Sequence, residues 1–474
     1  MLTLFDIVEK QAAQIEEQAT KIKKLETRLA TLERNSRNSS KPPSSDQGNH
    51  GNKPKPKTTR QSSGKKRGGQ VGHRGQTRKL VKNPDHIVKH KLPPSLKCPK
   101  CQQHTNTTPS GTQNRQVFDI PPINIVVTEH QAEQCQCEHC KATLTADFPA
   151  EASAPVQYGT NLQALCVYLN SYQLLPYKRL SDTLKALFDL NMSQGTIANI
   201  IASAGTKAKQ VQEQIDEALR KANILHSDET GCRLQGKRAW LHVASTSHLT
   251  SYHFDLKRGY EAMVNAGVLP EFTGRLIHDC WGAYSRFDQC EHGLCNAHLI
   301  RELIYASEEL KQPWAQPLLE LILKAKTLTD KHPEGLAEAT CQEYQKQYQD
   351  LVKQGLELNP EPERENGKRG RVKRSKQLNL LRRLHQKESD FLAFMTHPEV
   401  PFDNNQAERD LRMMKTREKI SGGFGSEQRA SDFCSLRSVV SSTLKQSRSV
   451  LDTIASMLVA PYATGNDLAS GLPE

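Results

Sequence analysis

Three acidic residues have the type and placement that metal-dependent chemistry on phosphate esters requires. Asp228 lies at the end of the short apolar run "ANILHSDET", and Asp279 lies near the end of "GRLIHDCWGAY"; both runs are typical of β-strands. Glu408 lies in "PFDNNQAERDLRMMKTREKISGGFGS", where the spacing of Glu408, Arg412 and Lys415 places them on one face of a helix. Glu408 is therefore either a solvated helix carboxylate with basic neighbours or part of a metal site that acts on an anionic polymer.

Each acid also has an ordinary structural interpretation. An Asp at a strand end is usually a turn or cap residue. If Asn405 is the N-cap of the helix, Glu408 stands at N3, where its carboxylate reaches back to the cap amide in a capping box. The two roles of Glu408 are compatible, because a carboxylate held in this way is a better metal ligand. Asp403 is expected to bracket the helix start, and the poorer ligand candidates nearby are Glu229, Asp288 and Asp410.

The order of elements after residue 220 predicts where the acids meet. Three antiparallel strands, a helix, a fourth strand, a second helix and a fifth strand are expected, which is the order of a ribonuclease-H-like fold. The first and fourth strands of that fold are neighbours, so Asp228 and Asp279 are expected to lie close together. The weak point is the helix between the last two strands, because only "SRFDQC" remains to form it.

Close carboxylates predict a metal centre. They repel one another unless cations compensate their charge. Two Mg²⁺ ions, with Mn²⁺ as the alternative, provide that compensation through hard oxygen ligands. Such a pair of ions also catalyses phosphoryl transfer, since one ion activates the attacking oxygen and the other stabilises the leaving oxygen. Glu408 is expected to complete this site, with Arg412 and Lys415 beside the phosphate.

The residues that separate Asp279 from Glu408 read as a helical insertion. They are mostly polar helical segments broken by the basic loop "NPEPERENGKRGRVKRSKQ", which is a candidate DNA contact or a solvated loop. After the last helix, the glycines of "SGGFGS" predict a flexible exit.

Four cysteines predict a structural zinc site. Cys98-x-x-Cys101 and Cys137-x-x-Cys140 each place two thiolates on one side of a metal, and together they complete a tetrahedral four-cysteine set. The spare thiol of Cys135 leaves open which cysteine is the third ligand. Small zinc modules of this kind often bind nucleic acid.

Composition indicates a polyanionic partner. The net charge is +13, the pI is about 9.1 and the mean hydropathy is −0.67, values that favour nucleic acid as the partner over a basic protein without one. The first residues lack a secretory signal, and no apolar run reaches the roughly 18 residues of a membrane span. We therefore expect a cytoplasmic protein with no membrane partner, whose cysteines bind metal rather than form disulfides.

The N-terminal part predicts self-association. Val8, Ile15, Ile22 and Leu29 repeat every seven residues between residues 4 and 33, which favours a coiled-coil homodimer or higher oligomer over an amphipathic helix packed on its own protein. The polar segment that follows should be disordered when free, and its Lys65, Lys66 and Arg67 either follow a phosphate backbone or belong to a plain tether.

Residues 156–220 read as helices with a turn near residues 191–193. Ser193 is a suitable N-cap, and Gln194, Thr196 and Asn199 on the helix after it could contact bases, as in a helix-turn-helix. A three-helix core without DNA binding is the alternative.

Several motifs together resemble one known family. The "NSRNSSKPPSSD" linker, "GGQVGHRGQTR", the two CxxC pairs, "SDETGCRLQGKRAWLHVAST", "HDCWGAY" and "FDNNQAERDLRMMKTREKISGGFGS" occur in the order found in DDE transposases of the insertion sequence 66 family. The resemblance covers nearly the whole chain. It implies a ribonuclease-H-like catalytic domain whose DDE triad is Asp228, Asp279 and Glu408. The "CNAH" at Cys295 to His298 looks like the C-x-x-H element of some DDE transposases, with a buried Cys and a helix-capping His as the alternative.

The resemblance also implies a function. It is that of a transposase of a bacterial insertion sequence, associated with the nucleoid, that binds terminal inverted repeats and catalyses Mg²⁺-dependent strand cleavage and strand transfer. Its partners would be the transposon ends, the target DNA and small accessory proteins of the same element. The alternatives are an inactive or regulatory DNA-binding relative and a nuclease of the same fold that does not join strands.

The expected architecture is multidomain α+β. In chain order it comprises a leucine-zipper-like coiled coil (1–36), a basic disordered linker (37–92), a zinc-finger or ribbon module (93–150), a helix-turn-helix-like domain (151–220), a ribonuclease-H-like catalytic domain (221–425) with a helical insertion at about 299–398, and a C-terminal helical region (426–474).

Overall fold

The computed structural model describes residues 10–18, 21–22, 25, 72–75, 77–121, 123–362, 372 and 374–470. These belong to two units, residues 58–128 and the rest of the chain, and each unit is described by itself. Most of the predicted coiled coil and the basic residues Lys65, Lys66 and Arg67 lie outside the described residues. Residues 10–18 are helical and exposed, and Ile15 of the predicted seam is 66% exposed, so the coiled coil stays a prediction.

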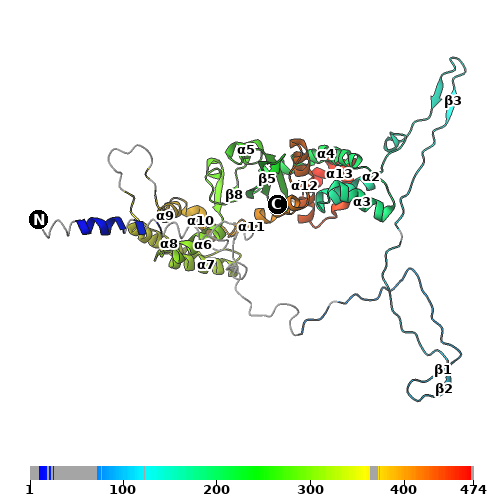
Figure 1. The fold of residues 1–474 in the computed structure, drawn as a ribbon, viewed down its shortest axis with the longest axis horizontal. Coiled ribbons are helices and arrows are strands. Elements are labelled where there is room, and N and C mark those ends of the chain that lie inside the picture. Colours follow the sequence, from blue (N-terminus) through cyan, green and yellow to red (C-terminus); the bar gives the residue numbers. More distant parts are fainter. Residues whose placement is uncertain are drawn as a thin grey trace. The chain divides into compact units, whose positions relative to one another are not determined.

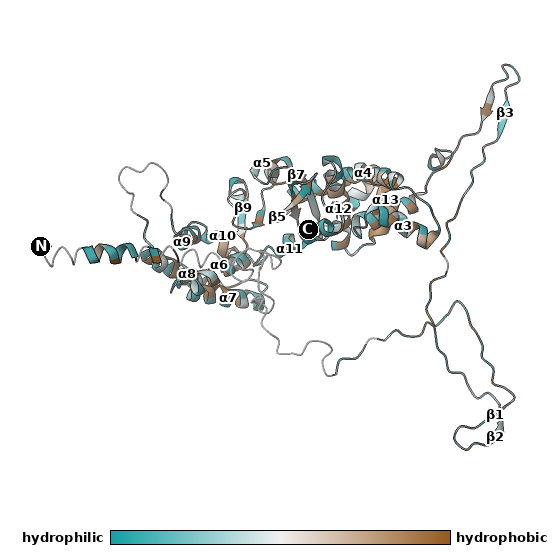
Figure 2. Ribbon diagram, in the orientation of Figure 1, coloured by the Kyte–Doolittle hydropathy of each residue, from teal (hydrophilic) through white to brown (hydrophobic). Residues whose placement is uncertain are grey.

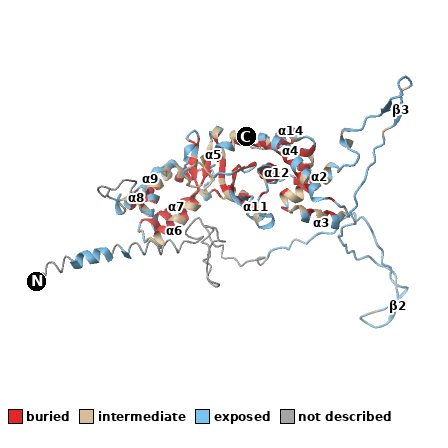
Figure 3. Cartoon of the chain, turned by 45° about the horizontal axis from the view of Figure 1, so that its top comes forward, coloured by how far each residue is buried: buried red, intermediate tan, exposed pale blue. Residues whose placement is uncertain are grey.

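The CxxC segments form two small β-hairpins. In one, β1 (Ser95–Lys97) pairs antiparallel with β2 (His104–Asn106); in the other, β3 (Gln134–Gln136) pairs antiparallel with β4 (Thr143–Thr145). All four strands are exposed along their whole length, as the pale blue of Figure 3 shows for β2 and β3. Neither hairpin buries an apolar core of its own, so a stabilising element other than packing is needed.

A five-stranded mixed sheet is the centre of the larger unit (Figure 1). Its order is β7-β6-β5-β8-β9, with β5, β6 and β7 antiparallel and β8 and β9 parallel to β5. The tight β5–β6 connection uses Gln235 and Gly236, both at positive φ (49° and 79°), as two-residue hairpins require. The strands are β5 (Ile224–Leu234), β6 (Lys237–Ser245), β7 (Thr250–Asp255), β8 (Arg275–His278) and β9 (Glu291–Leu294).

The two parallel connections of the sheet differ in length. Between β7 and β8 the chain forms α5 (Tyr260–Asn265) and the short η4 (Leu269–Glu271). Residues 279–290, all of which the structure describes, contain one 3₁₀ turn, η5 (Tyr284–Arg286), and no α-helix. The 3₁₀ turn and the rest of "SRFDQC" thus stand where the predicted order has a helix between the last two strands.

Helices from both sides of the sequence pack around the sheet. The long helix α4 (Gln194–Arg220) contacts α12 (Glu427–Lys445) and α14 (Pro461–Ala469), while α12 also packs on β7. One hydrophobic core joins α4, the sheet and α12, together with α2 (Thr160–Val167), α3 (Tyr177–Phe188) and α13 (Val450–Val459). Figure 3 shows the buried residues concentrated in these elements, and in Figure 2 helices such as α3 carry both hydrophilic and hydrophobic residues, as expected of helices with one buried face.

Helix α4 begins where the sequence predicted it to begin. Ser193 is the N-cap, and its Oγ accepts a hydrogen bond from the Thr196 N–H at 3.0 Å, which confirms the predicted cap. The preceding helix α3 ends at Asp189 in the left-handed conformation (φ 49°). Gln194 and Asn199 are exposed on the first turns of α4, whereas the Thr196 hydroxyl lies 2.9 Å from that of Ser193.

The residues between β9 and α11 (Asn405–Ser421) form a helical insertion, whose hydrophobic core also includes Ile277 of β8 and Leu294 of β9. The described part of the basic loop is limited to its ends, because residues 363–371 and 373 are outside the described residues. Among the described residues, no helix is long and apolar enough to cross a membrane. The insertion helices are α6 (Asn296–Glu308), α7 (Ala315–Lys331), α8 (Glu338–Leu358), α9 (Lys376–Gln386) and α10 (Glu388–Thr396).

Candidate active site

Two of the three acids lie at corresponding positions of two parallel strands, each two residues beyond the last paired residue. Strands β5 and β8 are paired up to His226 opposite Ile277. Continuing this register by two residues brings Asp228 opposite Asp279, just beyond the last pair. Each aspartate accepts a backbone N–H through Oδ1, from Glu229 at 2.9 Å for Asp228 and from Trp281 at 2.9 Å for Asp279. These bonds orient both carboxylates at the same edge of the sheet.

Electrostatics connect the third acid to this pair. Burial, together with the negative charges of Glu229, Asp279 and Glu408, raises the pKa of Asp228 to about 8. Glu408 is therefore close enough to Asp228 for its charge to be felt. The three carboxylates do not gather within the span of one ion, which is compatible with ligands that span two ions. A bound cation would relieve this repulsion.

The neighbouring carboxylate of Glu229 is bound by protein side chains. Its side chain is 1% exposed, and Oε1 accepts from Arg258 Nε at 2.7 Å while Oε2 accepts from the Tyr284 hydroxyl at 2.7 Å. Burial raises the pKa of Glu229, and the bonds from Tyr284 and Arg258 lower it in part. A carboxylate already satisfied by a guanidinium and a phenol is a poorer metal ligand than its neighbour Asp228.

Asn404, rather than Asn405, is the residue that anchors the helix carrying Glu408. Asn404 is the N-cap of α11, but its buried side chain points to β5: Nδ2 donates to the Ser227 carbonyl at 2.8 Å, and Oδ1 accepts from His226 Nδ1 at 2.8 Å. Glu408 therefore stands at N4, and the capping box predicted with Asn405 as N-cap is wrong. The physical reason is that the asparagine amide is used for tertiary hydrogen bonds next to Asp228.

Asp403 brackets the helix start as predicted. Its Oδ1 accepts the Asn405 N–H at 3.0 Å, and its Oδ2 accepts from Asn405 Nδ2 at 2.5 Å. The inner face of α11 presents Ala407, Leu411 and Met414 to the core beneath β5 and β6. This apolar stripe sets the rotation of the helix and directs Glu408 toward the sheet edge.

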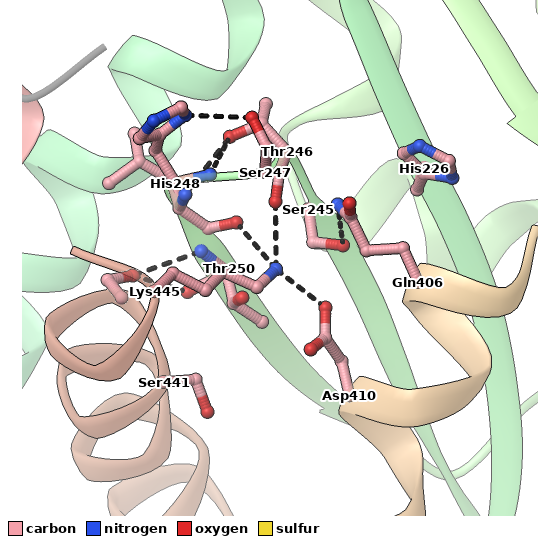
Figure 4. Close-up of polar contacts among 12 residues, drawn as sticks. His226, Ser245, Thr246, Ser247, His248, Thr250, Gln406, Asp410, Ser441 and Lys445 are labelled. Carbon is pink, nitrogen blue, oxygen red and sulfur yellow. Dashed lines mark hydrogen bonds and ion pairs between the residues drawn. The ribbon is translucent and has the colours of Figure 1, made fainter. Parts of the chain in front are cut away.

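A buried ion pair fixes the same helix from its other side. Asp410 accepts from Lys445 Nζ of α12 at 2.7 Å, with side chains 13% and 15% exposed. Lys445 also donates to the Thr246 carbonyl at 2.8 Å, so that Figure 4 shows it between α11 and the turn after β6. Burial lowers the pKa of Lys445, and Asp410 opposes that shift. Sequence analysis missed Lys445, since no local motif marks a partner that is 35 residues away.

The two basic residues predicted to share the face of Glu408 are exposed on α11. Arg412 lies one turn after Glu408. Lys415 Nζ donates to the Gly231 carbonyl of β5 at 2.9 Å and lies 3.6 Å from Glu418. Both cations therefore lie on α11, one and two turns after Glu408, and both are accessible to an anionic ligand.

The glycines after α11 form a docked segment rather than the flexible exit that was expected. Phe424 donates its N–H to the Arg233 carbonyl at 2.7 Å and accepts from the Gln235 N–H at 2.9 Å, next to the β5–β6 turn. A Cβ on Gly423 would lie 2.6 Å from the Arg233 carbonyl oxygen, and Gly422 has φ 67°. Glycine is required here by close approach to β5.

The Cys-x-x-His element lies beside Glu408. Cys295 is the N-cap of α6 and is 2% exposed, and its Sγ accepts the Asn404 N–H at 3.2 Å. The His298 side chain does not cap the helix; its Nδ1 is buried and has no hydrogen-bond partner among the described residues. Arg301 Nη2 lies 4.0 Å from Glu408 Oε1.

The two CxxC turns have the same backbone geometry. The Cys98 N–H donates to the Gln103 carbonyl (2.9 Å), and the Cys98 carbonyl accepts from the Gln102 N–H (2.8 Å). In the same way, Cys137 donates to the Ala142 carbonyl and accepts from the Lys141 N–H (both 2.9 Å). Gln102 and Lys141 both have positive φ, 62° and 59°. The exposed Cys135 lies on β3, outside this turn.

Both turns are prepared to carry thiolates. Backbone N–H groups of Cys101 and then Lys100 lower the pKa of the Cys98 thiol, and those of Cys140 and then His139 lower that of Cys137. Thiols with lowered pKa values in closed turns fit a zinc ion. The hairpins belong to different units, and each CxxC turn supplies two cysteines.

Comparison with known families gives three matches. A model described as the transposase IS66 family matches residues 155–432, more than half of the chain. The zinc-finger binding domain of transposase IS66 matches residues 95–141, a range that includes both CxxC turns. A family of unknown function matches residues 3–79. No curated protein matches the chain.

Proposed function

The chain belongs to the IS66 transposase family, and we propose that it catalyses DNA strand cleavage and strand transfer with Asp228, Asp279 and Glu408 as its metal-binding acids. The family and the zinc-finger domain make it a DNA-processing enzyme with a structural zinc module. The observation that supports the proposal is the parallel register of β5 and β8. Extended by two residues it would put Asp228 opposite Asp279, and the charge of Glu408 on α11 acts on Asp228.

A ribonuclease-H-like fold for the catalytic region is part of this proposal. Three antiparallel strands followed by two parallel ones, in the order β7-β6-β5-β8-β9, support it. The acids of such a sheet come from its first strand, its fourth strand and a later helix. The helical insertion between β9 and α11 then separates the second acid from the third in sequence without moving them apart in space.

The acids would hold two Mg²⁺ ions, or Mn²⁺. When bound, these ions activate the attacking oxygen and stabilise the leaving oxygen. The hard oxygen donors fit this role, and a bound cation would offset the burial and the neighbouring negative charges that raise the pKa of Asp228. Asn404 and the Asp410–Lys445 pair hold α11 so that Glu408 stays at the sheet edge.

The reaction would proceed in two in-line displacements. Water attacks the phosphodiester at the transposon end and releases a strand with a free 3′-hydroxyl. That hydroxyl then attacks a target phosphodiester, loses its proton and displaces the target 3′-oxygen. No covalent enzyme–DNA intermediate forms. Arg412 and Lys415 would bind backbone phosphates beside the acids and offset their charge.

The remaining predicted contacts position the DNA. The zinc hairpins, the start of α4 with Gln194, Thr196 and Asn199, and the basic segment at residues 65–67 would hold the terminal repeats and the target. The net charge of +13 favours such an extended phosphate contact. The N-terminal helix would pair two or more chains, and small proteins of the same element would assist them.

One substitution tests the triad. Asp279→Ala is expected to abolish strand cleavage in Mg²⁺ while binding of inverted-repeat DNA persists, because the variant removes one metal ligand and leaves the DNA-facing residues in place. Asp288→Ala, an exposed aspartate nine residues away in sequence, is the matched control and should cleave like the unmodified protein. Cleavage by Asp279→Ala at the unmodified rate would exclude the triad.

The products separate the alternatives. Joined strands support transposition, and nicks without joining support a nuclease of the same fold. DNA binding without cleavage by the unmodified protein would identify an inactive relative.

A further inference from the structure

Glu408 belongs to a second group of metal-binding atoms. One ligand atom each from Cys295, His298 and Glu408 all lie within 4.8 Å of one another. Across the described residues, this is the one group of three or more His, Cys, Asp or Glu side chains with that spacing. It includes neither Asp228 nor Asp279, and it is separate from the zinc hairpins.

Local structure explains why these three meet. Cys295 and His298 are three residues apart at the start of α6, which puts both side chains on one face of its first turn. The hydrogen bond from the Asn404 N–H to Cys295 Sγ joins the start of α11 to the start of α6. Asn404 is four residues before Glu408. One short hydrogen-bonded link between two helix starts therefore assembles the cluster.

The cluster has an unused ligand atom. Nδ1 of His298 is buried and, among the described residues, has no hydrogen-bond partner. Buried polar atoms are nearly always satisfied, so this nitrogen is available to bind a ligand such as a metal ion. Glu408 has Arg301 at 4.0 Å, a separation too long for a strong ion pair, and its carboxylate can turn toward a cation.

The donor types select the ion. A thiolate, an imidazole and a carboxylate are the ligands of Zn²⁺ and related transition ions, whereas Mg²⁺ takes oxygen ligands. We propose that Cys295, His298 and Glu408 form a binding site for one zinc-class ion, and that its occupation withdraws Glu408 from Asp228 and Asp279. The metal–sulfur bond forms as the Cys295 thiol releases its proton to solvent. The binding stands on the cluster alone; the effect on catalysis rests on the proposed function.

Cobalt binding tests the site without DNA or activity. The full-length protein is first loaded with one zinc per chain, which the four-cysteine module retains, and Co²⁺ is then titrated while thiolate–Co²⁺ absorption is measured. We expect one further equivalent to bind. Its absorption should be lost in Cys295→Ser, and its affinity should fall by about tenfold or more in His298→Gln.

The control is Cys341→Ser, which changes a partly buried thiol on α8 that bonds the Met395 carbonyl. This variant should bind Co²⁺ like the unmodified protein. Thermal unfolding of each variant checks that the fold is kept. Absence of a second equivalent, or a second equivalent unchanged in both Cys295→Ser and His298→Gln, would overturn the site.

Inhibition tests the sharing of Glu408. Zn²⁺ added to a Mg²⁺-supported cleavage reaction is expected to inhibit, and the Zn²⁺ concentration for half inhibition should rise about tenfold or more in Cys295→Ser, relative to the uninhibited rate of the same variant. Equal inhibition of both proteins would exclude the sharing. If no Mg²⁺-supported cleavage occurs in any protein, the proposed function fails, while Co²⁺ binding still decides the site.

Discussion

The CxxC hairpins and the group of three acids are two proposed metal-binding regions, and they are built in opposite ways. In each hairpin the cysteines are three residues apart, one turn positions them, and every strand residue is exposed. The acids come from β5, the end of β8 and α11, and they are held by buried contacts such as Asn404 with Ser227 and Asp410 with Lys445.

This difference determines what each region depends on. A hairpin with no buried core gains its order from the ion, because metal binding and folding are coupled. The acidic centre has its geometry before any ion binds, because the sheet and two cores hold it. The hairpins should therefore lose their structure when metal is removed, and the acidic centre should lose its geometry when its packing is changed.

Removal of zinc is expected to have the largest effect. Structural zinc contributes about 10–16 kcal/mol of apparent binding free energy at neutral pH, so chelation or Cys98→Ser should unfold the hairpins and weaken DNA-end binding. Limited proteolysis should cut between residues 93 and 150, while the main thermal transition stays in place. Cys135→Ser is the control and should keep its zinc. If the hairpins resist protease without zinc, their structure does not depend on the ion, and the two regions do not differ in this respect.

Loss of the buried ion pair should come next. Lys445→Met leaves Asp410 buried without its cation, so the free energy of unfolding should fall by about 3–5 kcal/mol. Denaturant unfolding measures this. Lys419→Met, at an exposed lysine of α11, should change stability little. The double variant Asp410→Asn with Lys445→Met should recover part of the loss; a double variant as unstable as Lys445→Met would show that the charge is not the cause.

Asp228→Asn is expected to stabilise the metal-free protein. The folded-state pKa of about 8 lies above the unfolded value, so ionisation of Asp228 disfavours folding. The stabilisation should be absent below about pH 4, grow between pH 4 and 8, and level off above pH 8. Melting temperatures across this range, with and without Mg²⁺, measure it. A gain that does not change with pH would contradict the raised pKa of Asp228.

Asn404→Ala is expected to have the smallest of the four effects on stability. It removes the bonds to His226 and Ser227 and should cost about 2 kcal/mol. Cleavage should fall more than DNA binding, because α11 would no longer hold Glu408 at the sheet edge. Asn405→Ala, whose side chain contacts Asp403, is the matched control. Equal loss of cleavage in both variants would mean that Asn404 has no special positioning role.

Features that depend on neighbouring residues were predictable from the sequence. The Ser193 cap, the Asp403 bracket, the two CxxC turns and the strand that carries Asp228 all depend on contacts within a few residues. The family itself was also recognisable, because its motifs are contiguous runs. Turns and helix caps are formed by hydrogen bonds between residues a few positions apart, so residue type and spacing are sufficient to identify them.

Features that depend on distant residues were decided by the tertiary structure. The amide of Asn404 could cap α11 or bond β5, and only the position of Ser227, 177 residues earlier, decides between these uses. The same holds for Gly423 against Arg233, for Lys445 against Asp410, and for Glu408 beside Cys295 and His298. A polar side chain has several local partners of similar energy, and burial selects the one that leaves no polar group unsatisfied. The sequence by itself therefore determined which acids and cysteines are candidates, and the packing of β5, β8, α6 and α11 decided which of them share a site.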